Sequence, residues 1–300
     1  MTASRLIALD WGSTRLRAFL LGADGAVQAF RQSEQGASTL SGAAAFEQAF
    51  NAVTGDWPVL PALACGMVGS QHGWREAPYA PCPADAAVLV KHALQLSDRL
   101  WILPGLMHDA GQPDVMRGEE TQIVGAIALH PELAAHACLV LPGTHSKWAR
   151  VEAGRVTGFA THMTGELYAL LRQHSVLARL MPADGAVPPF SQAFLAGVDA
   201  ARKQGALGHQ LFAVRTLGLF KRLPPEQLPD YLSGLLIGHE IGHELAAGAP
   251  EHLALVGDPA LCERYALAMG RFGRFGAAAP LQLNNTASAG LWQLAQTMGL

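Results

Sequence analysis

Short apolar runs separated by polar turns open the chain. Residues 6–9 are apolar and lead into Asp10, and Gly12, Ser13 and Thr14 follow. Polar and apolar residues then alternate strictly from Arg15 onward. A continuous apolar run is typical of a buried strand and strict alternation of a half-exposed one. The pattern predicts two strands joined by a tight polar turn.

A similar arrangement recurs near the middle of the chain. The apolar run 137–141 leads into a polar turn, and strands are expected at 147–152 and 155–161, with a hairpin turn at Ala153-Gly154. The turn after the apolar run consists of Gly143, Thr144, His145, Ser146 and Lys147. Both halves of the chain therefore contain a strand, a turn of glycine and hydroxyl residues, and a second strand.

A third glycine turn follows the apolar run 253–256. Gly257 ends the predicted strand, Asp258 suits the N-cap of a helix, and Pro259 suits its first turn. Such a turn either joins a strand to a helix or packs against a nucleotide base or ribose.

Strands and helices alternate over the whole chain, which predicts an α/β protein. The predicted strands are 5–10, 15–21, 26–33, 62–66, 100–103, 137–141, 147–152, 155–161 and 253–257. The predicted helices are 42–54, 84–96, 118–129, 164–174, 190–204, 207–215, 224–247, 259–272 and 286–298. Pro131 and the polar residues around it suggest a boundary, giving an N-terminal lobe of 1–133 and a C-terminal lobe of 134–300.

Composition agrees with this organisation and excludes some partners. The 300 residues are 50% hydrophobic and 15% charged, with a net charge of −3, so a sizeable core is expected and a nucleic-acid partner is not. No apolar run is long enough to cross a membrane, and the most apolar tract, 232–245, is interrupted by His239, Glu240, His243 and Glu244. The first residues carry no apolar signal segment.

Four cysteines are scattered without a C-x-x-C pair, at Cys65, Cys82, Cys138 and Cys262. Buried thiols in a reducing cytoplasm are the expected state. A homodimer is left open by the composition.

The first two turns have the chemistry of phosphate sites. Gly12 lets a ligand approach the backbone closely, and Ser13 and Thr14 add hydroxyls beside turn N–H groups. Asp10 at a strand end can hold a hydrated Mg²⁺. An ordinary hairpin whose aspartate caps a turn is the alternative. Lys147 either neutralises phosphate charge or is a lysine on the surface of a strand.

Motifs along the whole chain resemble the 2-dehydro-3-deoxygalactonokinases, within the actin–hexokinase–Hsp70 ATPase superfamily. The matching segments are Asp10-Trp11-Gly12-Ser13-Thr14, Gly66-Met67-Val68-Gly69-Ser70, Trp101-Ile102-Leu103-Pro104-Gly105-Leu106, Val115-Met116-Arg117-Gly118-Glu119-Glu120-Thr121-Gln122, Leu141-Pro142-Gly143-Thr144-His145-Ser146-Lys147-Trp148, Thr164-Gly165-Glu166-Leu167 and Ser233-Gly234-Leu235-Leu236-Ile237-Gly238.

The resemblance implies two RNase-H-like lobes around a nucleotide cleft. It also implies ATP and Mg²⁺ as cofactors, and phosphorylation of the terminal hydroxyl of a 2-keto-3-deoxy sugar acid, a step in galactonate breakdown. The phosphates and metal would be held by the first turn (Asp10, Gly12, Ser13 and Thr14) and the second (Gly143, Thr144, His145, Ser146 and Lys147). Gly257 and Asp258 would mark the adenosine pocket, although the second glycine usual at this turn is replaced by Asp258.

The segment around Gly118 is the candidate for acceptor chemistry. Glu119 and Glu120 are adjacent, so one of the two points into the site, where it can serve as general base. A similar Gly-Glu-Glu helix start in exopolyphosphatase-type proteins favours Glu120, and acids placed favourably at a helix N-terminus are the alternative. Arg117 can bind the acceptor's carboxylate through two N–H groups, with Arg75 and Arg15 as alternatives.

Further substrate contacts are expected from two loops. Gly69 and Ser70 follow a strand and offer backbone N–H groups and a hydroxyl. Thr164, Gly165 and Glu166 lie near the sugar or a hinge, or simply begin a helix.

His239-Glu240-Ile241-Gly242-His243 matches the zinc-hydrolase pattern H-E-x-x-H. Glu263 has a plausible spacing for a third ligand but lacks supporting residues, and the family resemblance gives this helix a structural role. Besides a kinase, the sequence therefore leaves open a nucleotide-switched protein without catalysis, a phosphohydrolase and a zinc hydrolase. It does not distinguish galactonate-derived from gluconate-derived acceptors.

Overall fold

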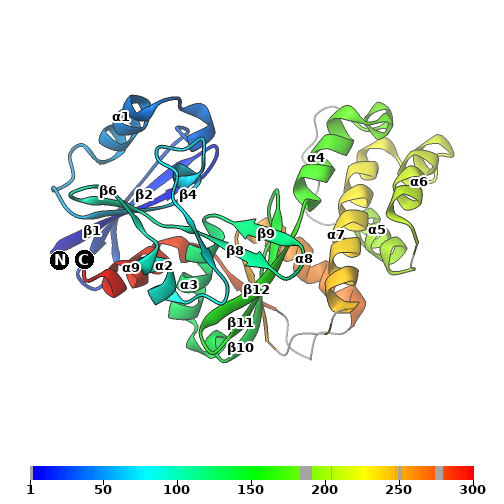
Figure 1. Cartoon of the computed structure of the whole chain (residues 1–300). Helices are drawn as coiled ribbons and strands as arrows, with labels where there is room; N and C mark the ends of the chain where they lie inside the picture. Colours follow the sequence, from blue (N-terminus) through cyan, green and yellow to red (C-terminus); the bar gives the residue numbers. More distant parts are fainter. Residues whose placement is uncertain (1–2, 183–190, 204, 247, 249–251, 274–279) are drawn as a thin grey trace. The chain divides into compact units, whose positions relative to one another are not determined.

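The computed structural model describes residues 3–182, 191–203, 205–246, 248, 252–273 and 280–300 (Figure 1). Contacts between residues group the chain into two compact units. The first comprises Met1–His136, Ala149–Phe159 and Asn285–Leu300, and the second comprises Ala137–Trp148 and Ala160–Asn284. Within the described residues, no helix is long and apolar enough to span a membrane.

A mixed sheet forms the centre of the first unit. Its strand order is β3-β2-β1-β4-β7-β6, in which β1 is antiparallel to β2 and parallel to β4. The strands are β1 (Ser4–Trp11), β2 (Leu16–Gly22), β3 (Val27–Ser33), β4 (Ala62–Gly66), β6 (Leu94–Ser97) and β7 (Leu100–Ile102). A smaller sheet consists of β5 (Tyr79–Pro81), β8 (Gly105–Asp109) and β9 (Pro113–Met116).

Helices complete the first unit. They are α1 (Ala43–Thr54), α2 (Ala86–Lys91), α3 (Glu119–Leu129) and α9 (Thr286–Met298), with 3₁₀ turns at Ala37–Thr39, Met67–Gly69 and Pro131–Ala134. Trp11 is fully buried at the end of β1, and its ring packs against Phe46 of α1 and against Trp74. The apolar side chains on one face of β1 and β2 thus pack against the apolar face of α1.

The sheet that carries the second polar turn has the order β12-β11-β10-β13-β14. β10 is parallel to β13, and β13 is parallel to β14. The strands are β10 (His136–Leu141), β11 (Ser146–Glu152), β12 (Arg155–His162), β13 (Leu253–Val256) and β14 (Leu281–Leu283). In both sheets three consecutive strands lie side by side, and two later strands continue the sheet beyond the first of them. The same strand order therefore occurs twice, with β6 added in the first unit.

The helices of the second unit are α4 (Thr164–His174), α5 (Gln192–Arg202), α6 (Leu207–Leu219), α7 (Leu228–Ala246) and α8 (Pro259–Phe272). Short 3₁₀ turns occur at Val176–Leu180 and Pro225–Gln227. α7 is largely buried because α4, α5, α6 and α8 all pack on it. Its apolar composition on every side follows from this central position.

The α/β class and the predicted strands and helices are confirmed, with one error. The helix predicted over 84–96 ends at Lys91, because residues 94–97 pair with β7 as strand β6. β5, β8, β9 and β14 were not predicted, since these strands of three to five residues carry too short a pattern. The predicted helix ends at 190, 204 and 247 lie outside the described residues.

The grouping by contacts is discontinuous along the sequence, whereas the sequence analysis predicted one boundary between residues 133 and 134. Residues 285–300 group with the first unit because α9 packs on α3. The two backbones meet at Gly125 and Gly290. A Cβ on Gly125 would lie 1.9 Å from the backbone oxygen of Thr286, and one on Gly290 would lie 1.9 Å from the backbone oxygen of Thr121.

The second unit has an equivalent contact between α5 and α7. A Cβ on Gly197 would lie 2.1 Å from the Tyr231 oxygen, and one on Gly234 would lie 2.0 Å from the Phe194 oxygen. In each unit, one helix pair therefore depends on glycine for its spacing.

Replacing Gly290 by alanine should destabilise the protein, because the added methyl group meets a backbone oxygen that cannot move without shifting α3. The expected loss is about 1–3 kcal/mol or more of unfolding free energy, measured as a lower urea midpoint. Gly270→Ala is the matched control, since a Cβ there meets nothing within 4 Å in the interior of α8. It should leave stability unchanged or raise it by up to about 1 kcal/mol. Equal effects of the two substitutions would contradict the packing described here.

Candidate functional site

Acidic side chains gather where β1 and β4 end in the first unit. The two parallel strands place Asp10 beside Cys65 and Trp11 beside Gly66. α3 begins at the same place, because a Cβ on Gly118 would lie 3.3 Å from the Gly66 Cα. The negative charges of Asp10 and Glu120 reinforce the effect of burial in raising the pKa of the Cys65 thiol, so both carboxyl groups lie near this thiol. Asp10, Glu119 and Glu120 are called the acidic centre below.

Glu120 is the buried member of the acidic centre, with 1% of its surface exposed. Its Oε2 accepts the Gly118 N–H at 2.7 Å, and its Oε1 accepts the Thr121 hydroxyl at 3.1 Å. Burial, followed by the charge of Glu119, raises the pKa of Glu120 to about 8. These hydrogen bonds, together with one from the Glu120 backbone N–H, do not replace the hydration that a buried carboxylate loses, so the proton is held more tightly.

Glu119 is half-buried and points elsewhere, its Oε2 accepting the Arg117 N–H at 3.1 Å. Gly118, whose N–H binds Glu120, has φ +112°, a conformation that suits glycine. The two neighbouring carboxylates thus take different environments, as their adjacency on a helix predicts.

Asp10 lies at the other side of the acidic centre. Burial raises the pKa of Asp10, and the positive charge and hydrogen bond of Arg17, whose Nη1 lies 3.2 Å from Oδ2, act in the opposite direction. The side chain keeps some exposure, and carboxylate oxygens are the ligands that Mg²⁺ prefers.

The turn after Asp10 is braced by the 3₁₀ turn at 37–39. Gly12 donates its N–H to the Arg15 oxygen at 2.9 Å, and the Ser13 oxygen accepts both the N–H and the hydroxyl of Ser38. The side chains of Ser13 and Thr14 are exposed. The backbone of this turn is therefore ordered, while its hydroxyl groups remain accessible to a ligand.

Arg117 lies close to the loop that follows β4. Its guanidinium stacks 4.2 Å above the Tyr79 ring, and Nη2 donates to the Ala77 oxygen at 2.9 Å. A Cβ on Gly69 would lie 3.1 Å from Arg117 Nη1. Within the described part of the chain, Nε and Nη1 are buried and have no hydrogen-bond partner. Buried cationic donors without an acceptor are rare in proteins and suit an oxygen-bearing ligand.

The other residues predicted for acceptor binding differ in setting. Ser70 is half-buried and follows the 3₁₀ turn at 67–69, and Arg75 is exposed. Arg15, the alternative to Arg117, forms an exposed ion pair with Glu34.

A cavity of about 350 Å³ lies in the second unit between α7 and α8. Its walls come from the loop after β10, the start of α4 and the facing sides of α7 and α8, and they are mostly apolar. The lining residues are Gly143, Thr144, Thr164, Gly165, Tyr168, Ser233, Leu236, Ile237, Leu261, Arg264 and Tyr265. This space is called the α7–α8 cavity below.

Hydrogen bonds connect the loop Gly143–Lys147 to the start of α4. Glu166 donates its N–H to the Thr144 oxygen at 3.0 Å, and its side chain pairs with His145. Gly165 allows the close approach, because a Cβ there would lie 2.4 Å from the Gly143 oxygen. Thr164 and Glu166, predicted near the sugar or a hinge, therefore lie beside this loop.

The end of this loop, which the sequence predicts to bind phosphate, is buried. Ser146 is fully buried, and its hydroxyl donates to Glu240 at 2.8 Å. Lys147 is 5% exposed, and its Nζ donates to the Thr161 hydroxyl at 3.0 Å. The two residues open β11, where successive side chains point to opposite faces, and both side chains have partners within the protein. Their phosphate-binding role stays a prediction.

Gly257 and Asp258 form the turn that starts α8. Gly257 has φ +144° and donates its N–H to the Leu283 oxygen, and Asp258 caps α8 by accepting the Leu261 N–H at 3.0 Å. The capping role predicted for Asp258 is confirmed. Neither residue lines the α7–α8 cavity; the next turns of the same helix do.

The sequence analysis gave no role to Ser233, Leu236, Ile237, Arg264, Tyr265 or Tyr168. Ser233, Leu236 and Ile237 could have been found, because they lie in the segment from Ser233 to Gly238 that carried the family resemblance. Tyr168, Arg264 and Tyr265 lie on helices whose pattern of apolar residues is equally typical of a buried core.

Each polar side chain of the H-E-x-x-H segment has a protein partner. His239 pairs with Gln210, the ring of His243 lies 5.8 Å from that of His162, and Glu240 is 3% exposed within a hydrogen-bonded cluster. Among the described residues, no group of three or more metal-ligating side chains occurs. The geometry gives the zinc-hydrolase alternative no support.

Comparison with known proteins gives consistent matches over nearly the whole chain. The family model of 2-keto-3-deoxy-galactonokinase matches residues 10–294. The 2-dehydro-3-deoxygalactonokinase of Escherichia coli strain K12 is 41% identical over 282 residues, which is 91% of each chain. A crystal structure of a Sinorhizobium meliloti protein, provisionally named 2-dehydro-3-deoxygalactonokinase, superposes with a TM-score of 0.87 at 35% identity, covering 98% of this chain and 99% of that one.

More distant structures share the fold alone. Component A of the (R)-2-hydroxyglutaryl-CoA dehydratase of Acidaminococcus fermentans has a TM-score of 0.54 at 12% identity, covering 99% of this chain and all of that one. The activator of the 2-hydroxyisocaproyl-CoA dehydratase of Clostridium difficile, solved with bound ADPNP, has a TM-score of 0.51 at 10% identity, covering 98% and 96%. The predicted two-lobed ATPase fold is confirmed.

The raised pKa of Glu120 predicts a specific pH dependence of stability. Folded Glu120, with its pKa of about 8, keeps its proton up to about pH 8, whereas the unfolded residue loses it near the ordinary glutamate pKa of 4.5. Folding therefore retains a proton between these values, and the contribution of Glu120 to stability falls as the pH rises through this window, by at most about 1.4 kcal/mol per pH unit.

Glu120→Gln resembles the protonated side chain, so it should gain stability relative to the wild type between pH 5 and pH 8. Urea midpoints of both proteins at the two pH values measure this difference. Substitution of the exposed Glu226 by glutamine is the control and should show no such trend. A constant difference between Glu120→Gln and the wild type at both pH values would show that Glu120 is not protonated in the folded protein.

Proposed function

Because the chain belongs to the 2-keto-3-deoxy-galactonokinase family, it is a carbohydrate kinase, and we propose that it transfers the terminal phosphoryl group of ATP to the C6 hydroxyl of 2-dehydro-3-deoxy-galactonate. The observation that carries the proposal beyond family membership is the buried Glu120 in the acidic centre, whose pKa of about 8 lies close to neutrality.

Glu120 is the proposed general base. A base is most effective when its pKa lies near the working pH, because it is then available without its proton and still accepts one readily. In the unprotonated form, Glu120 would accept the proton of the C6 hydroxyl as the oxygen attacks the phosphorus. Glu119 contributes through its charge, which raises the pKa of Glu120.

Asp10 is the proposed ligand for Mg²⁺. Its partly accessible carboxylate, at the end of β1 and beside the turn Gly12–Thr14, has the chemistry that this ion requires. When bound, Mg²⁺ would neutralise charge on the phosphates. The hydroxyls of Ser13 and Thr14 and the close approach permitted by Gly12 suit contacts with phosphate oxygens.

The α7–α8 cavity is the proposed site for the nucleoside of ATP. Its volume falls in the range of sites for small ligands, and its largely apolar walls suit a purine base. Gly143, Thr144 and His145 form the exposed part of the adjoining loop and are assigned to the phosphates. Gly257 and Asp258 contribute by starting α8, whose side chains line the cavity.

Arg117 is the proposed partner of the acceptor's carboxylate, since its Nε and Nη1 have no other acceptor among the described residues. Gly69 and Ser70 lie in the loop beside it, and the exposed Arg75 follows in the same segment. Thr164 and Glu166 are assigned to the nucleotide side instead, because they contact the Gly143–Lys147 loop and its partners.

The proposal is tested by coupled ADP release with Mg²⁺–ATP. Addition of 2-dehydro-3-deoxy-galactonate should stimulate the release strongly, and the gluconate-derived isomer, assayed in parallel, reports the selectivity. Glu120→Gln should lower kcat by about 10²–10⁴-fold with little change in KM, because the base acts only in the transition state. Glu119→Gln should cost much less. Release that is independent of the sugar acid would instead support a phosphohydrolase.

Removal of the guanidinium in Arg117→Ala should raise KM for the sugar acid on the order of tenfold to a hundredfold, the value of a charged hydrogen-bonded pair. The amide derivative of the acceptor, which lacks the negative charge, should be affected much less. Arg75→Ala is the control for the loss of a nearby positive charge. Equal losses for acid and amide would show that Arg117 supports the structure without binding the carboxylate.

A further inference from the structure

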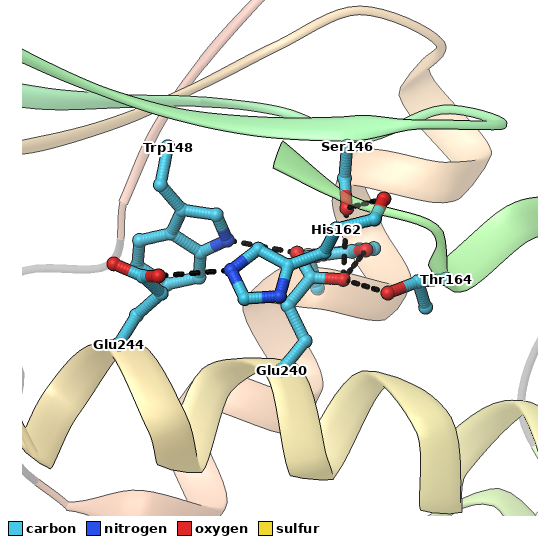
Figure 2. Close-up of polar contacts among 7 residues, drawn as sticks. Ser146, Trp148, His162, Thr164, Glu240 and Glu244 are labelled. Atoms are coloured by element: carbon cyan, nitrogen blue, oxygen red, sulfur yellow. Dashed lines mark hydrogen bonds and ion pairs between the residues drawn. The ribbon is translucent and has the colours of Figure 1, made fainter. Parts of the chain in front are cut away.

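One buried carboxylate connects the walls of the α7–α8 cavity. Figure 2 shows Glu240 of α7 pointing toward β11 and the start of α4. Its Oε1 accepts the Trp148 Nε1–H at 2.8 Å. Its Oε2 accepts the hydroxyls of Ser146 and Tyr265 at 2.8 Å each, and also that of Thr164.

These four donors come from three elements other than α7. Ser146 and Trp148 belong to β11, Thr164 is the first residue of α4, and Tyr265 belongs to α8. A carboxylate accepts about four hydrogen bonds, and this one has four donors, three on Oε2 and one on Oε1. Each donor is neutral, and the carboxylate is satisfied by their number rather than by a single opposite charge.

The elements held in this way are those that form the α7–α8 cavity. Thr164 and Tyr265 line it directly, and Ser146 ends the loop whose Gly143 and Thr144 line it. Leu236 and Ile237, four and three residues before Glu240, lie on the same side of α7 and line it as well. Glu240 itself is not part of the lining, so it lies behind the wall.

Glu244 provides a comparison within the same helix. It lies one turn further along α7 and accepts a hydrogen bond from His162 of β12 at 2.8 Å, as Figure 2 also shows. Like Glu240 it is buried, but His162 is not among the residues that line the cavity. Both carboxylates are thus buried hydrogen-bond acceptors on α7, and they differ chiefly in whether their partners belong to the walls of the cavity.

We propose that Glu240 is a positioning residue for nucleotide binding, which fixes the Gly143–Lys147 loop, the start of α4 and Tyr265 in the arrangement that receives ATP. The inference rests on the proposed function for the identity of the ligand. It also assigns a role to the acid of the H-E-x-x-H segment, as a hydrogen-bond acceptor rather than a catalytic group.

The test is the affinity for a non-hydrolysable ATP analogue with Mg²⁺, measured by calorimetry on wild type, Glu240→Gln and Glu244→Gln. The amide nitrogen of Glu240→Gln has no free lone pair, so either the hydroxyls that donate to Oε2 or the Trp148 Nε1–H loses its acceptor. We expect Kd to rise on the order of tenfold to a hundredfold. KM for ATP should rise with it, while KM for the sugar acid stays within about twofold.

Glu244→Gln should lower thermal stability and leave nucleotide affinity unchanged. If Glu240→Gln does not fold, Trp148→Phe takes its place. It removes the donor to Oε1 without touching a residue that lines the cavity, and Kd should rise several-fold, by roughly the value of one hydrogen bond.

Unchanged nucleotide affinity in a folded Glu240→Gln or Trp148→Phe protein would overturn the inference. So would an equal loss in Glu244→Gln, which would indicate general destabilisation. A wild type that binds the nucleotide but phosphorylates no sugar acid would refute the proposed function alone, and the comparison of variants would still decide the role of Glu240. A wild type that does not bind the nucleotide would overturn both.

Discussion

Gly118 brings the start of α3 against Gly66 at the end of β4, and this close contact between two backbones decides where the acidic centre lies. A side chain on Gly118 would press the start of α3 away from the strand, because its Cβ would lie 3.3 Å from the Gly66 Cα, and one on Gly66 would meet the Trp11 backbone oxygen at 2.7 Å. The same constraint applies in the second unit, where Gly165 permits the contact of α4 with the Gly143–Lys147 loop. The glycine pairs between α3 and α9 and between α5 and α7 then hold the helices at this spacing. In both units, glycine lets two backbones approach closely, and this close approach sets the positions of the functional groups.

Two buried glutamates show how the surroundings of a carboxylate decide its use. Burial and a neighbouring acid outweigh the hydrogen bonds to Glu120 and raise its pKa to about 8. Glu240 has four donors from three elements, three of them on Oε2 and one on Oε1. A carboxyl group whose pKa lies near neutrality is suited to exchanging a proton, whereas one that accepts hydrogen bonds from three separate elements is suited to fixing the groups that surround it.

The repeated strand order relates the two large sheets, although the residues at their strand ends differ in chemistry. In the first sheet the strand ends carry acids, and in the second the corresponding loop leads to a largely apolar cavity. One distant structural relative is named an activator of a dehydratase, so likeness of fold does not by itself assign an activity. The match to the kinase family assigns the chain to the kinases, and the acidic centre and the Arg117 donors support the reaction proposed for it.

Local patterns determined the elements and much of the site. The apolar runs before Asp10 and Gly143 predicted the strands and turns, and Asp258 was recognised as a helix cap, because each depends on residues close in sequence. The motif Arg117-Gly118-Glu119-Glu120 identified the acidic centre, although not the burial that separates its two acids. The strand β6 was missed because its pairing with β7 outweighs the helical pattern of its own residues.

Contacts between distant residues decided the rest. Ser146 and Lys147 have the composition of a phosphate loop, yet both side chains are buried, with partners 94 and 14 residues away. Glu240 belongs to a zinc-hydrolase pattern by sequence, and only its donors from β11, α4 and α8 point to the positioning role proposed for it. The α7–α8 cavity likewise appears only when helices far apart in the chain are packed together. A sequence specifies hydrophobic period and turn chemistry residue by residue, whereas the direction and partners of a buried polar side chain depend on elements that meet only in the folded protein.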